Sequence, residues 1–206
     1  GVNHGKGIAI GKAVWAPVNC GYHADDYKYG KLYQWGRKYG QGYSGELYVN
    51  KVKTNTEISD ATTPTISEGG VSLTSGQHSS NSNVFYLRDK THYLDWLYTQ
   101  DNTLWNSGTE TKPIKTSYDP CPEGWRIPTC SELKELETNS SDWSSDQNEQ
   151  EGYWFYGLSE IGEEIPKIFF PAAGVRYDPV AVGRGKYCAY WTSSLYNPYD
   201  GKKKYQ

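Results

Sequence analysis

The four cysteines are the residues of this chain with the widest choice of chemistry. Cys121 and Cys130 flank the centre of the motif "DPCPEGWRIPTCSELKEL", whereas Cys20 and Cys188 lie far from it on either side. No pair has C-x2-C spacing and no histidine stands beside a cysteine in a zinc-finger arrangement, so a structural zinc site is not expected. An even number of cysteines in a polar, tyrosine-rich chain without methionine is typical of an oxidising compartment, which predicts two disulfides.

Three pairings of the four cysteines are open. We favour Cys20–Cys121 and Cys130–Cys188, because Cys130 begins a helix on its buried side, where a strand around Tyr187 to Trp191 could pack. The alternative is a reactive thiol at Cys130, whose pKa the helix dipole would lower. A nucleophile also needs a base, and the four histidines fall in the first half of the chain and share no local motif with Cys130.

The helix that follows the motif has a clear start signal. Thr129 and Glu132 fit the S/T-x-x-E capping box, in which the two side chains satisfy exposed amides at the helix end. Pro128 discourages helix before this point, and Leu133 and Leu136 continue the apolar face. The pattern predicts a helix over Cys130 to Glu137, with the side chain of the preceding arginine paired to an acidic residue.

The remaining elements are placed by periodicity. Alternating β-branched residues predict one or two strands within Ile8 to Val18, and apolar residues at helical spacing predict a short amphipathic helix over Tyr29 to Tyr39. Residues 42–84 are rich in Ser, Thr, Gly and Asn and are expected to form a long loop insertion in a single domain of residues 1–206. The segments "KIFFPAAGVRY" and "KYCAYWTSS" predict buried strands.

Composition excludes some classes of partner. The net charge of −3 argues against nucleic acid, because phosphate binding requires a basic face, and the basic run at 202–204 is typical of a solvated tail. No apolar stretch reaches the roughly 20 residues that span a bilayer, so no membrane span is expected. The chain begins with glycine rather than methionine, which is compatible with an export signal that has been removed.

The aromatic content of 19 Tyr and 8 Trp suggests an adhesive, wet surface, because both side chains combine a flat apolar body with a polar tip. The simpler interpretation is that these residues fill the core and that "GYWFYG" is a buried strand. The acidic stretch "SSDWSSDQNEQEG" lacks an EF-hand pattern, so neither a metal nor a cofactor is expected. The candidate ligand-binding residues are Trp143, Tyr153, Trp154, Tyr156, Arg176, Tyr177, Arg184 and Tyr190.

Five motifs carry a family resemblance, and together they cover most of the chain outside the insertion. In order they are "WAPVNCGY", "YGKLYQWGRKYG", "DPCPEGWRIPTCSELKEL", "FFPAAGVR" and "YWTSS". They resemble the Fibrobacter succinogenes major paralogous domain and the C-terminal domains of fimbrillin-like surface proteins of Bacteroides. The skeleton is also similar to a wider group with a C-type-lectin-like, formylglycine-generating-enzyme-like fold.

The resemblance implies an α+β fold of C-type-lectin-like type, in which two helices flank a small twisted antiparallel sheet with long loops. It also implies an exported, often lipid-anchored cell-surface protein. The closing strands of the family are expected to be absent, and Cys130 and Cys188 depart from its pattern. We therefore expect a non-enzymatic adhesin or pilus-tip module that recognises a glycan or a surface protein. The alternatives are a structural pilus or envelope subunit and, more remotely, a cysteine oxidase of the formylglycine-generating type.

Overall fold

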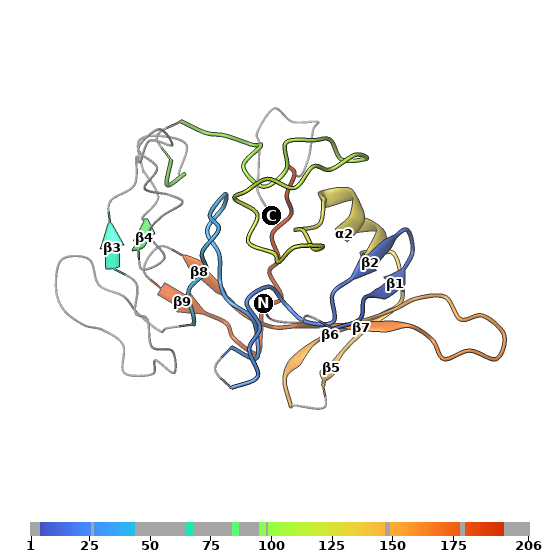
Figure 1. Cartoon of the computed structure of the whole chain (residues 1–206). Helices are drawn as coiled ribbons and strands as arrows, with labels where there is room; N and C mark the ends of the chain where they lie inside the picture. Colours follow the sequence, from blue (N-terminus) through green and yellow to red (C-terminus); the bar gives the residue numbers. More distant parts are fainter. Residues whose placement is uncertain are drawn as a thin grey trace.

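A computed structural model describes residues 5–25, 27–43, 65–67, 84–86, 95–97, 99–146, 149–177 and 180–195. Within these ranges the chain forms short strands, one helix and long ordered loops (Figure 1). The predicted insertion at 42–84 lies almost wholly outside the described residues. Among the described residues, no helix has the length and apolar character needed to cross a membrane.

The first predicted strands are confirmed as an antiparallel hairpin. β1 (Ile8–Ile10) pairs with β2 (Ala13–Trp15), with Ile8 opposite Trp15. The turn uses Gly11, whose positive φ of 63° is a conformation that other residues rarely adopt. Ile10 and Trp15 are buried, so the hairpin contributes one apolar side to the core.

The predicted helix is also confirmed, with the predicted bounds. In α2 (Cys130–Glu137), the Thr129 side chain accepts a hydrogen bond from the Glu132 backbone, and the Glu132 side chain accepts one from the Thr129 backbone. Arg126 forms the expected ion pair with Glu132, with two nitrogen–oxygen distances of 2.8 and 2.5 Å. The capping box and the ion pair therefore share one carboxylate.

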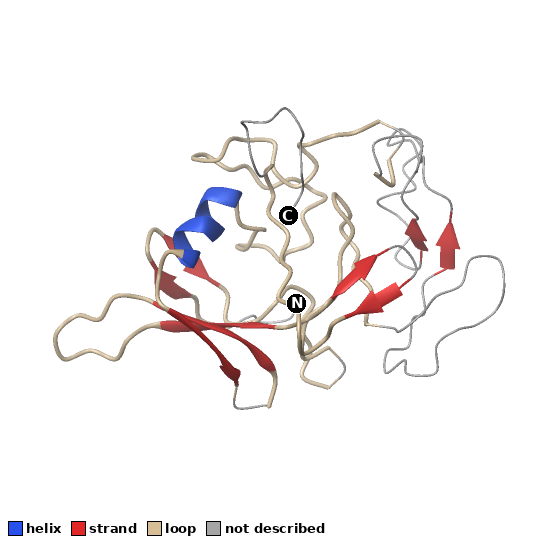
Figure 2. Cartoon of the chain, turned by 180° about the vertical axis from the view of Figure 1, so that it is seen from behind, coloured by secondary structure: helices blue, strands red, loops and turns tan. Residues whose placement is uncertain are grey.

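Three strands form the largest sheet. β5 (Ser141–Ser145), β6 (Glu151–Tyr156) and β7 (Lys167–Pro171) are antiparallel in the order β5-β6-β7. Helix α2 and the β1–β2 hairpin lie on the same side of this sheet (Figures 1 and 2). The sheet therefore has an inner face towards α2 and an outer face on the opposite side.

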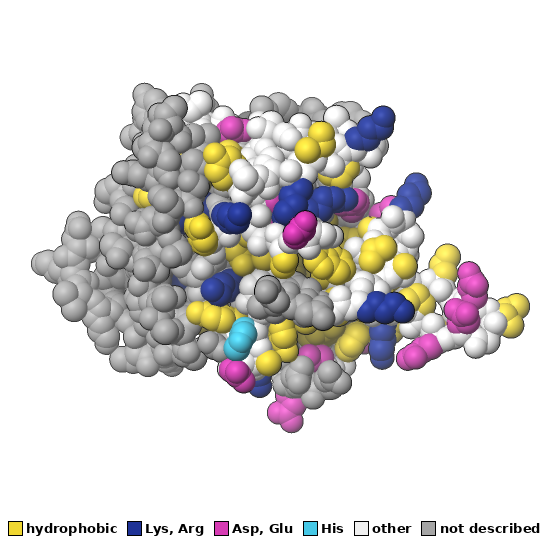
Figure 3. All heavy atoms as spheres, in the orientation of Figure 1, with side chains coloured by type: hydrophobic (Ala, Val, Ile, Leu, Met, Phe, Trp, Pro, Cys, Tyr) yellow, Lys and Arg dark blue, Asp and Glu magenta, His cyan; other side chains and the backbone are white. Residues whose placement is uncertain are grey.

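The connection between β6 and β7, residues 157–166, projects away from the body of the protein (Figures 1 and 3). It is ordered by hydrogen bonds such as Gly157 N–H to Pro166 C=O at 2.7 Å. Leu158 and Ile161 are fully exposed on it, alongside three glutamates. We call residues 157–166 the projecting loop.

Two further strand pairs complete the described structure. β8 (Val175–Tyr177) and β9 (Val180–Val182) are antiparallel, whereas β3 (Thr65–Ser67) and β4 (Val84–Tyr86) are parallel. The described part thus has three small antiparallel sheets and one parallel pair. The strands predicted in "KIFFPAAGVRY" correspond to β7 and β8.

The predicted α+β, C-type-lectin-like fold with two flanking helices is wrong for the described residues, which contain one short helix. The segment Tyr29 to Tyr39 belongs to a closed loop. Leu32 N–H donates to Gln41 C=O at 2.8 Å, and Gln41 N–H donates to Leu32 C=O at 2.9 Å. Gly30 and Gly36 have positive φ values of 76° and 71°, which are incompatible with a right-handed helix. Of the residues at helical spacing, Trp35 is buried, Leu32 is half-buried and Tyr39 is 39% exposed, so the spacing does not mark one buried helix face.

The strand predicted in "KYCAYWTSS" is also absent, because residues 186–194 run as irregular chain. Single hydrogen bonds hold this segment in place, including Gly174 N–H to Tyr187 C=O at 3.0 Å and Ser193 N–H to Pro128 C=O at 2.8 Å. The segment thus passes between other elements without joining a sheet.

The apolar interior is divided into two clusters. The sheet core lies between α2, the β1–β2 hairpin and the inner face of the sheet, and comprises Ile10, Trp15, Leu136, Ile168 and Phe170. The loop core is built mostly by irregular segments, and comprises Trp35, Tyr86, Trp96, Leu97, Leu104, Trp105 and Ile127.

Candidate functional site

A buried carboxylate organises the cysteine-containing motif. Asp119 is only 2% exposed. Its carboxylate accepts hydrogen bonds from Cys121 N–H at 2.8 Å, Ile127 N–H at 2.9 Å and the Lys115 ammonium at 2.7 Å. Prolines at 120 and 122 prevent a regular hydrogen-bond pattern here, so the aspartate side chain supplies the acceptors that the backbone does not. This arrangement fixes the position of Cys121.

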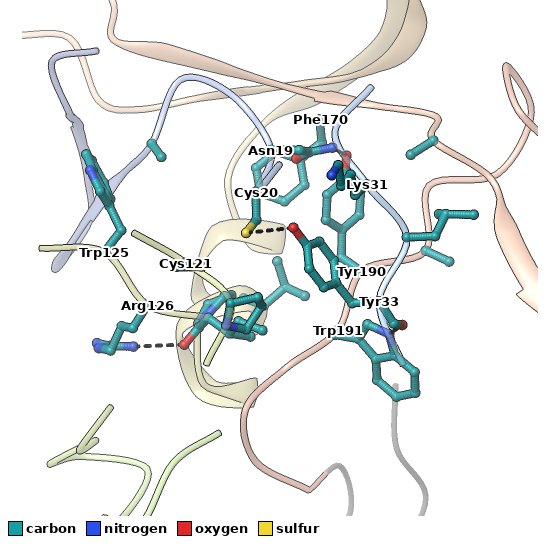
Figure 4. A pocket seen from close by; sticks show the side chains of 18 of the residues that line it. Asn19, Cys20, Lys31, Tyr33, Cys121, Trp125, Arg126, Phe170, Tyr190 and Trp191 are labelled. Atoms are coloured by element: carbon teal, nitrogen blue, oxygen red, sulfur yellow. Dashed lines mark hydrogen bonds between the residues drawn. The ribbon is translucent and has the colours of Figure 1, made fainter. Parts of the chain in front are cut away.

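Cys20 and Cys121, one of the two favoured disulfide pairs, lie together as free thiols, and the disulfide itself stays a prediction. The Cys20 thiol donates to the Tyr33 hydroxyl at 3.3 Å (Figure 4). The two thiols also hydrogen-bond to each other. The contact with Cys121 lowers the pKa of Cys20, while the contact with Cys20 and burial raise the pKa of Cys121. The pair therefore loses its first proton more readily than its second. All four cysteines are thiols in the structure.

Cys130 and Cys188 have separate surroundings, and no described contact joins them. Burial raises the pKa of Cys130, whose backbone N–H donates to Ser194 Oγ at 2.9 Å. The prediction that the helix dipole lowers the pKa of Cys130 is therefore wrong. Burial also raises the pKa of Cys188 to about 11, and its thiol lies 3.4 Å from the Phe170 carbonyl oxygen. Neither thiol is activated as a nucleophile.

A cavity of about 1060 Å³ lies between the two cores and includes the Cys20–Cys121 pair in its wall. Tyr190 donates to the Pro171 carbonyl at 2.7 Å and accepts from the Asn19 amide at 2.9 Å, so these lining groups satisfy one another. The hydroxyl of Tyr190, a predicted ligand residue, is thus engaged in hydrogen bonds within the protein. Burial raises its pKa. Among the described lining residues there is no histidine that could serve as a base for a thiol.

The outer face of the three-stranded sheet carries a second, more accessible group of residues. The register places Asp142 opposite Trp154, Trp154 opposite Phe169, and Tyr156 opposite Lys167. The Trp154 and Phe169 rings lie 5.0 Å apart at 45°, and the Lys167 ammonium lies 4.8 Å from the Trp154 ring centre. We call Asp142, Trp154, Tyr156, Lys167 and Phe169 the outer aromatic face.

Local geometry explains how the rings fit on this face and where polar groups border them. A side chain at Gly152 would come within 2.7 Å of Phe169 Cζ, so the glycine leaves room for that ring to lie across the strand. The Tyr156 hydroxyl hydrogen-bonds to Asp142, which raises the pKa of Tyr156. The three aromatic side chains are half-buried, whereas Asp142 and Lys167 are exposed. This arrangement combines an apolar platform with an acceptor at one side and a donor at the other.

The predicted ligand residues do not form one cluster. Trp154 and Tyr156 belong to the outer aromatic face, whereas Trp143 and Tyr153 point to the inner side of the sheet. Their rings lie 5.0 Å apart, edge to face, and beyond the sheet core, where they are 41% and 38% exposed. The alternation of residues along one strand separates the two pairs.

The predicted arginines lie apart from both aromatic pairs and contact residues 29, 42 and 43. Arg184 lies over the rings of Tyr29 and Tyr43, at 4.8 and 4.1 Å, and Arg176 Nη2 donates to the Gly42 carbonyl at 3.1 Å. Both arginines therefore contact the first residues of the predicted insertion, and Arg184 also contacts Tyr29 before it. The side chain of Tyr177 lies outside the described residues.

The sequence prediction missed Asp142, Lys167 and Phe169. A pairing of the strands around "GYWFYG" and "KIFFP" would have indicated Lys167 and Phe169, because strict alternation places every second residue of each strand on one face. Asp142 would also have required the pairing of β5 with β6. Among the described residues, no group of three or more His, Cys, Asp or Glu side chains could hold a metal ion.

Comparison of the chain with protein-family models, with curated proteins and with solved structures found no match. The resemblance of its five motifs to the Fibrobacter and fimbrillin-like domains therefore stays a prediction.

Proposed function

We propose that this protein is a non-enzymatic binding module that recognises carbohydrate through the outer aromatic face. The observation that carries the proposal is the Trp154–Phe169 ring pair beside Tyr156 on an open sheet face. The C–H-bearing side of a sugar ring is apolar and packs against flat aromatic rings, while its hydroxyl groups need nearby donors and acceptors. Asp142 and Lys167 supply these groups at the border of the platform.

The Lys167 ammonium over Trp154 does not prevent ligand binding. An exposed cation–π contact contributes about 0.5–1 kcal/mol, which is less than the roughly 2 kcal/mol or more that a central aromatic anchor contributes to an interface. A ligand that stacks on Trp154 can therefore displace the lysine head group. Once displaced, the flexible ammonium can donate to ligand hydroxyl or carboxylate oxygens.

An exported, cell-surface location belongs to the same proposal. Its support is the resemblance of the sequence motifs to fimbrillin-like surface proteins, together with the cysteine and tyrosine usage. Recognition of a surface protein is the other form of adhesion that this location allows. A glycan is favoured here because the aromatic platform is small and is bordered by single polar groups.

The test compares two tryptophans of one β-hairpin. The wild-type protein is screened on an array of neutral and acidic oligosaccharides, and the best-binding soluble oligosaccharide is titrated calorimetrically. Trp154→Ala should weaken that binding at least about 30-fold, equivalent to the loss of a central aromatic anchor of roughly 2 kcal/mol. Trp143→Ala is the matched control, because Trp143 points to the opposite face, and its affinity per site should change less than about threefold.

Absence of binding across the array would contradict the proposal. So would equal effects of the two alanine variants, because the outer aromatic face would then have no special role. Lys167→Ala sharpens the result, since it removes the charge but keeps the platform. Acidic oligosaccharides should then lose more affinity than neutral ones, because the acidic ones lose a charge-assisted hydrogen bond and the neutral ones only a hydrogen bond to a hydroxyl group.

A structural role in a pilus or envelope assembly is the second candidate function. The observation that favours it is the exposed strand β5, which is an outer strand of its sheet. Assembly and carbohydrate recognition use different parts of the sheet, namely its edge and its outer face, and can therefore be tested separately.

A further inference from the structure

Strand β5 forms one edge of the three-stranded sheet, and all five of its residues are exposed. Its sequence, Ser-Asp-Trp-Ser-Ser, contains neither lysine nor proline, the residues that commonly prevent an edge strand from pairing with another chain. Trp143 at its centre is 41% exposed. An edge that lacks these residues and exposes a tryptophan can pair with another strand.

The hydrogen-bond pattern shows which backbone groups point to the open edge. Tyr156 N–H donates to Ser140 C=O at 3.0 Å, and Asp146 N–H donates to Gln150 C=O at 2.9 Å. In an antiparallel pair, residues whose N–H and C=O groups point to the partner strand alternate with residues whose groups point away from it. The even-numbered residues from 140 to 146 therefore direct their backbone groups towards β6. The N–H and C=O groups of Ser141, Trp143 and Ser145 therefore point outwards.

We propose that β5 pairs antiparallel with β5 of a second copy of this chain, across a two-fold axis that passes beside Trp143. In this register Trp143 lies opposite its own counterpart, and Ser141 lies opposite the counterpart of Ser145. All three outward-pointing residues then face one another and exchange about six backbone hydrogen bonds. The two three-stranded sheets become one continuous sheet.

The side chains are compatible with this self-pairing. Asp142 lies opposite the counterpart of Ser144, so the one charged residue of the strand does not face its own copy. Trp143 and Tyr153 form an exposed edge-to-face pair with ring centres 5.0 Å apart. The two-fold axis brings this pair beside its copy, which buries four aromatic rings that a monomer leaves in water.

The dimer has a consequence that rests on the proposed function. A two-fold axis perpendicular to the sheet keeps both outer aromatic faces on the same side. The dimer then presents two carbohydrate sites in one direction and gains avidity for a surface that displays many copies of a glycan. The pairing of β5 itself does not depend on carbohydrate binding.

The test is sedimentation velocity of the whole chain over a range from micromolar to millimolar concentration. The wild-type protein should show a reversible monomer–dimer equilibrium. Trp143→Lys should raise the dimer dissociation constant more than tenfold, because a lysine at the two-fold axis faces its own copy. Ile161→Lys is the matched control on the projecting loop, where an equally drastic change of an exposed apolar residue should leave the dimer unchanged.

A second variant tests backbone pairing with the tryptophan intact. Ser141→Pro removes an outward-pointing N–H at the first position of an edge strand, where proline is tolerated, and should also weaken the dimer. Near-ultraviolet circular dichroism checks that each variant is folded. A wild-type protein that stays monomeric at millimolar concentration overturns the proposal, as does loss of the dimer in Ile161→Lys alone. Monovalent titration with an oligosaccharide should give the same affinity per site for Trp143→Lys, so failure of carbohydrate binding is distinguishable from failure of dimerisation.

Discussion

The two cores of this protein satisfy their buried polar groups in different ways. In the sheet core, strand ladders and the capped helix α2 pair most backbone groups with one another. In the loop core, side chains take this role. The indole N–H groups of Trp35, Trp96 and Trp105 donate to carbonyls of Asp101, Trp35 and Arg37, at 3.0, 2.8 and 3.3 Å.

The loop core also uses amide side chains in place of a strand neighbour. Gln34 donates to the Tyr86 carbonyl at 2.6 Å and accepts from the Tyr86 N–H at 3.0 Å. The Asn106 carbonyl oxygen accepts from Gly108 N–H and Ile114 N–H, each at 2.8 Å. The stability of an irregular core therefore depends on individual polar side-chain atoms. The stability of a core made of regular elements depends mainly on the apolar volume that it buries.

The largest effect is expected at Asp119. Asp119→Ala leaves the N–H groups of Cys121 and Ile127 without their acceptor and removes the carboxylate that pairs with Lys115, which should destabilise the protein by about 3–5 kcal/mol. Urea unfolding followed by tryptophan fluorescence measures this change. Glu123→Ala, an exposed carboxylate in the same loop, is the control and should have little effect. A loss below about 1 kcal/mol for Asp119→Ala would show that the loop does not depend on this carboxylate.

Oxidation of Cys20 and Cys121 to a disulfide should have the next largest effect. The bridge would join the N-terminal segment to the margin of the loop core and, by closing a loop of roughly 100 residues, stabilise by about 2–4 kcal/mol. Peptide mapping under non-reducing conditions after air oxidation should find this bridge. Cys130 and Cys188 should remain as thiols, because the structure does not bring them together. Discovery of a Cys130–Cys188 bridge would contradict the structure.

A matched pair of substitutions compares the two cores directly. Trp96→Phe removes an indole that donates a 2.8 Å buried hydrogen bond, whereas the Trp15 indole nitrogen has no hydrogen-bond partner among the described residues. Both changes remove similar apolar volume. Trp96→Phe should therefore destabilise by about 1–2 kcal/mol more than Trp15→Phe, since it also removes a buried hydrogen bond. If thermal and urea unfolding gave the same loss of unfolding free energy for both variants, the two cores would not differ in their dependence on buried hydrogen bonds.

The smallest effect concerns the pH dependence of helix α2. Burial raises the pKa of Glu132, but hydrogen bonds from Arg126 and the Thr129 backbone outweigh it and leave the pKa below the usual range. A lowered pKa in the folded state means that this stabilisation is present above the ordinary glutamate pKa of about 4.3 and is lost as the pH falls below it. Glu132→Gln should cost about 1 kcal/mol at neutral pH and flatten the acid limb of the stability curve. If the fall in stability at low pH were unchanged in this variant, other carboxylates would be its cause.

The sequence by itself determined the local elements. The capping box placed α2 at its true bounds, alternation located the β1–β2 hairpin, and the motif around Cys121 indicated a fixed structural segment. These signals are short-range, because a cap, a tight turn or a run of alternating residues specifies its own backbone conformation.

Tertiary structure alone decided how these elements are combined. Helical spacing at Tyr29 to Tyr39 proved to be a closed loop, because cross-loop hydrogen bonds and two left-handed glycines replaced the helical pattern. The candidate ligand residues were divided among four regions, one of them the cavity wall that contains Tyr190. Phe169 and Lys167 joined Trp154 only through the pairing of β6 with β7. Such choices depend on contacts between residues distant in sequence, and residue type and spacing do not encode which of several compatible partners will be adjacent.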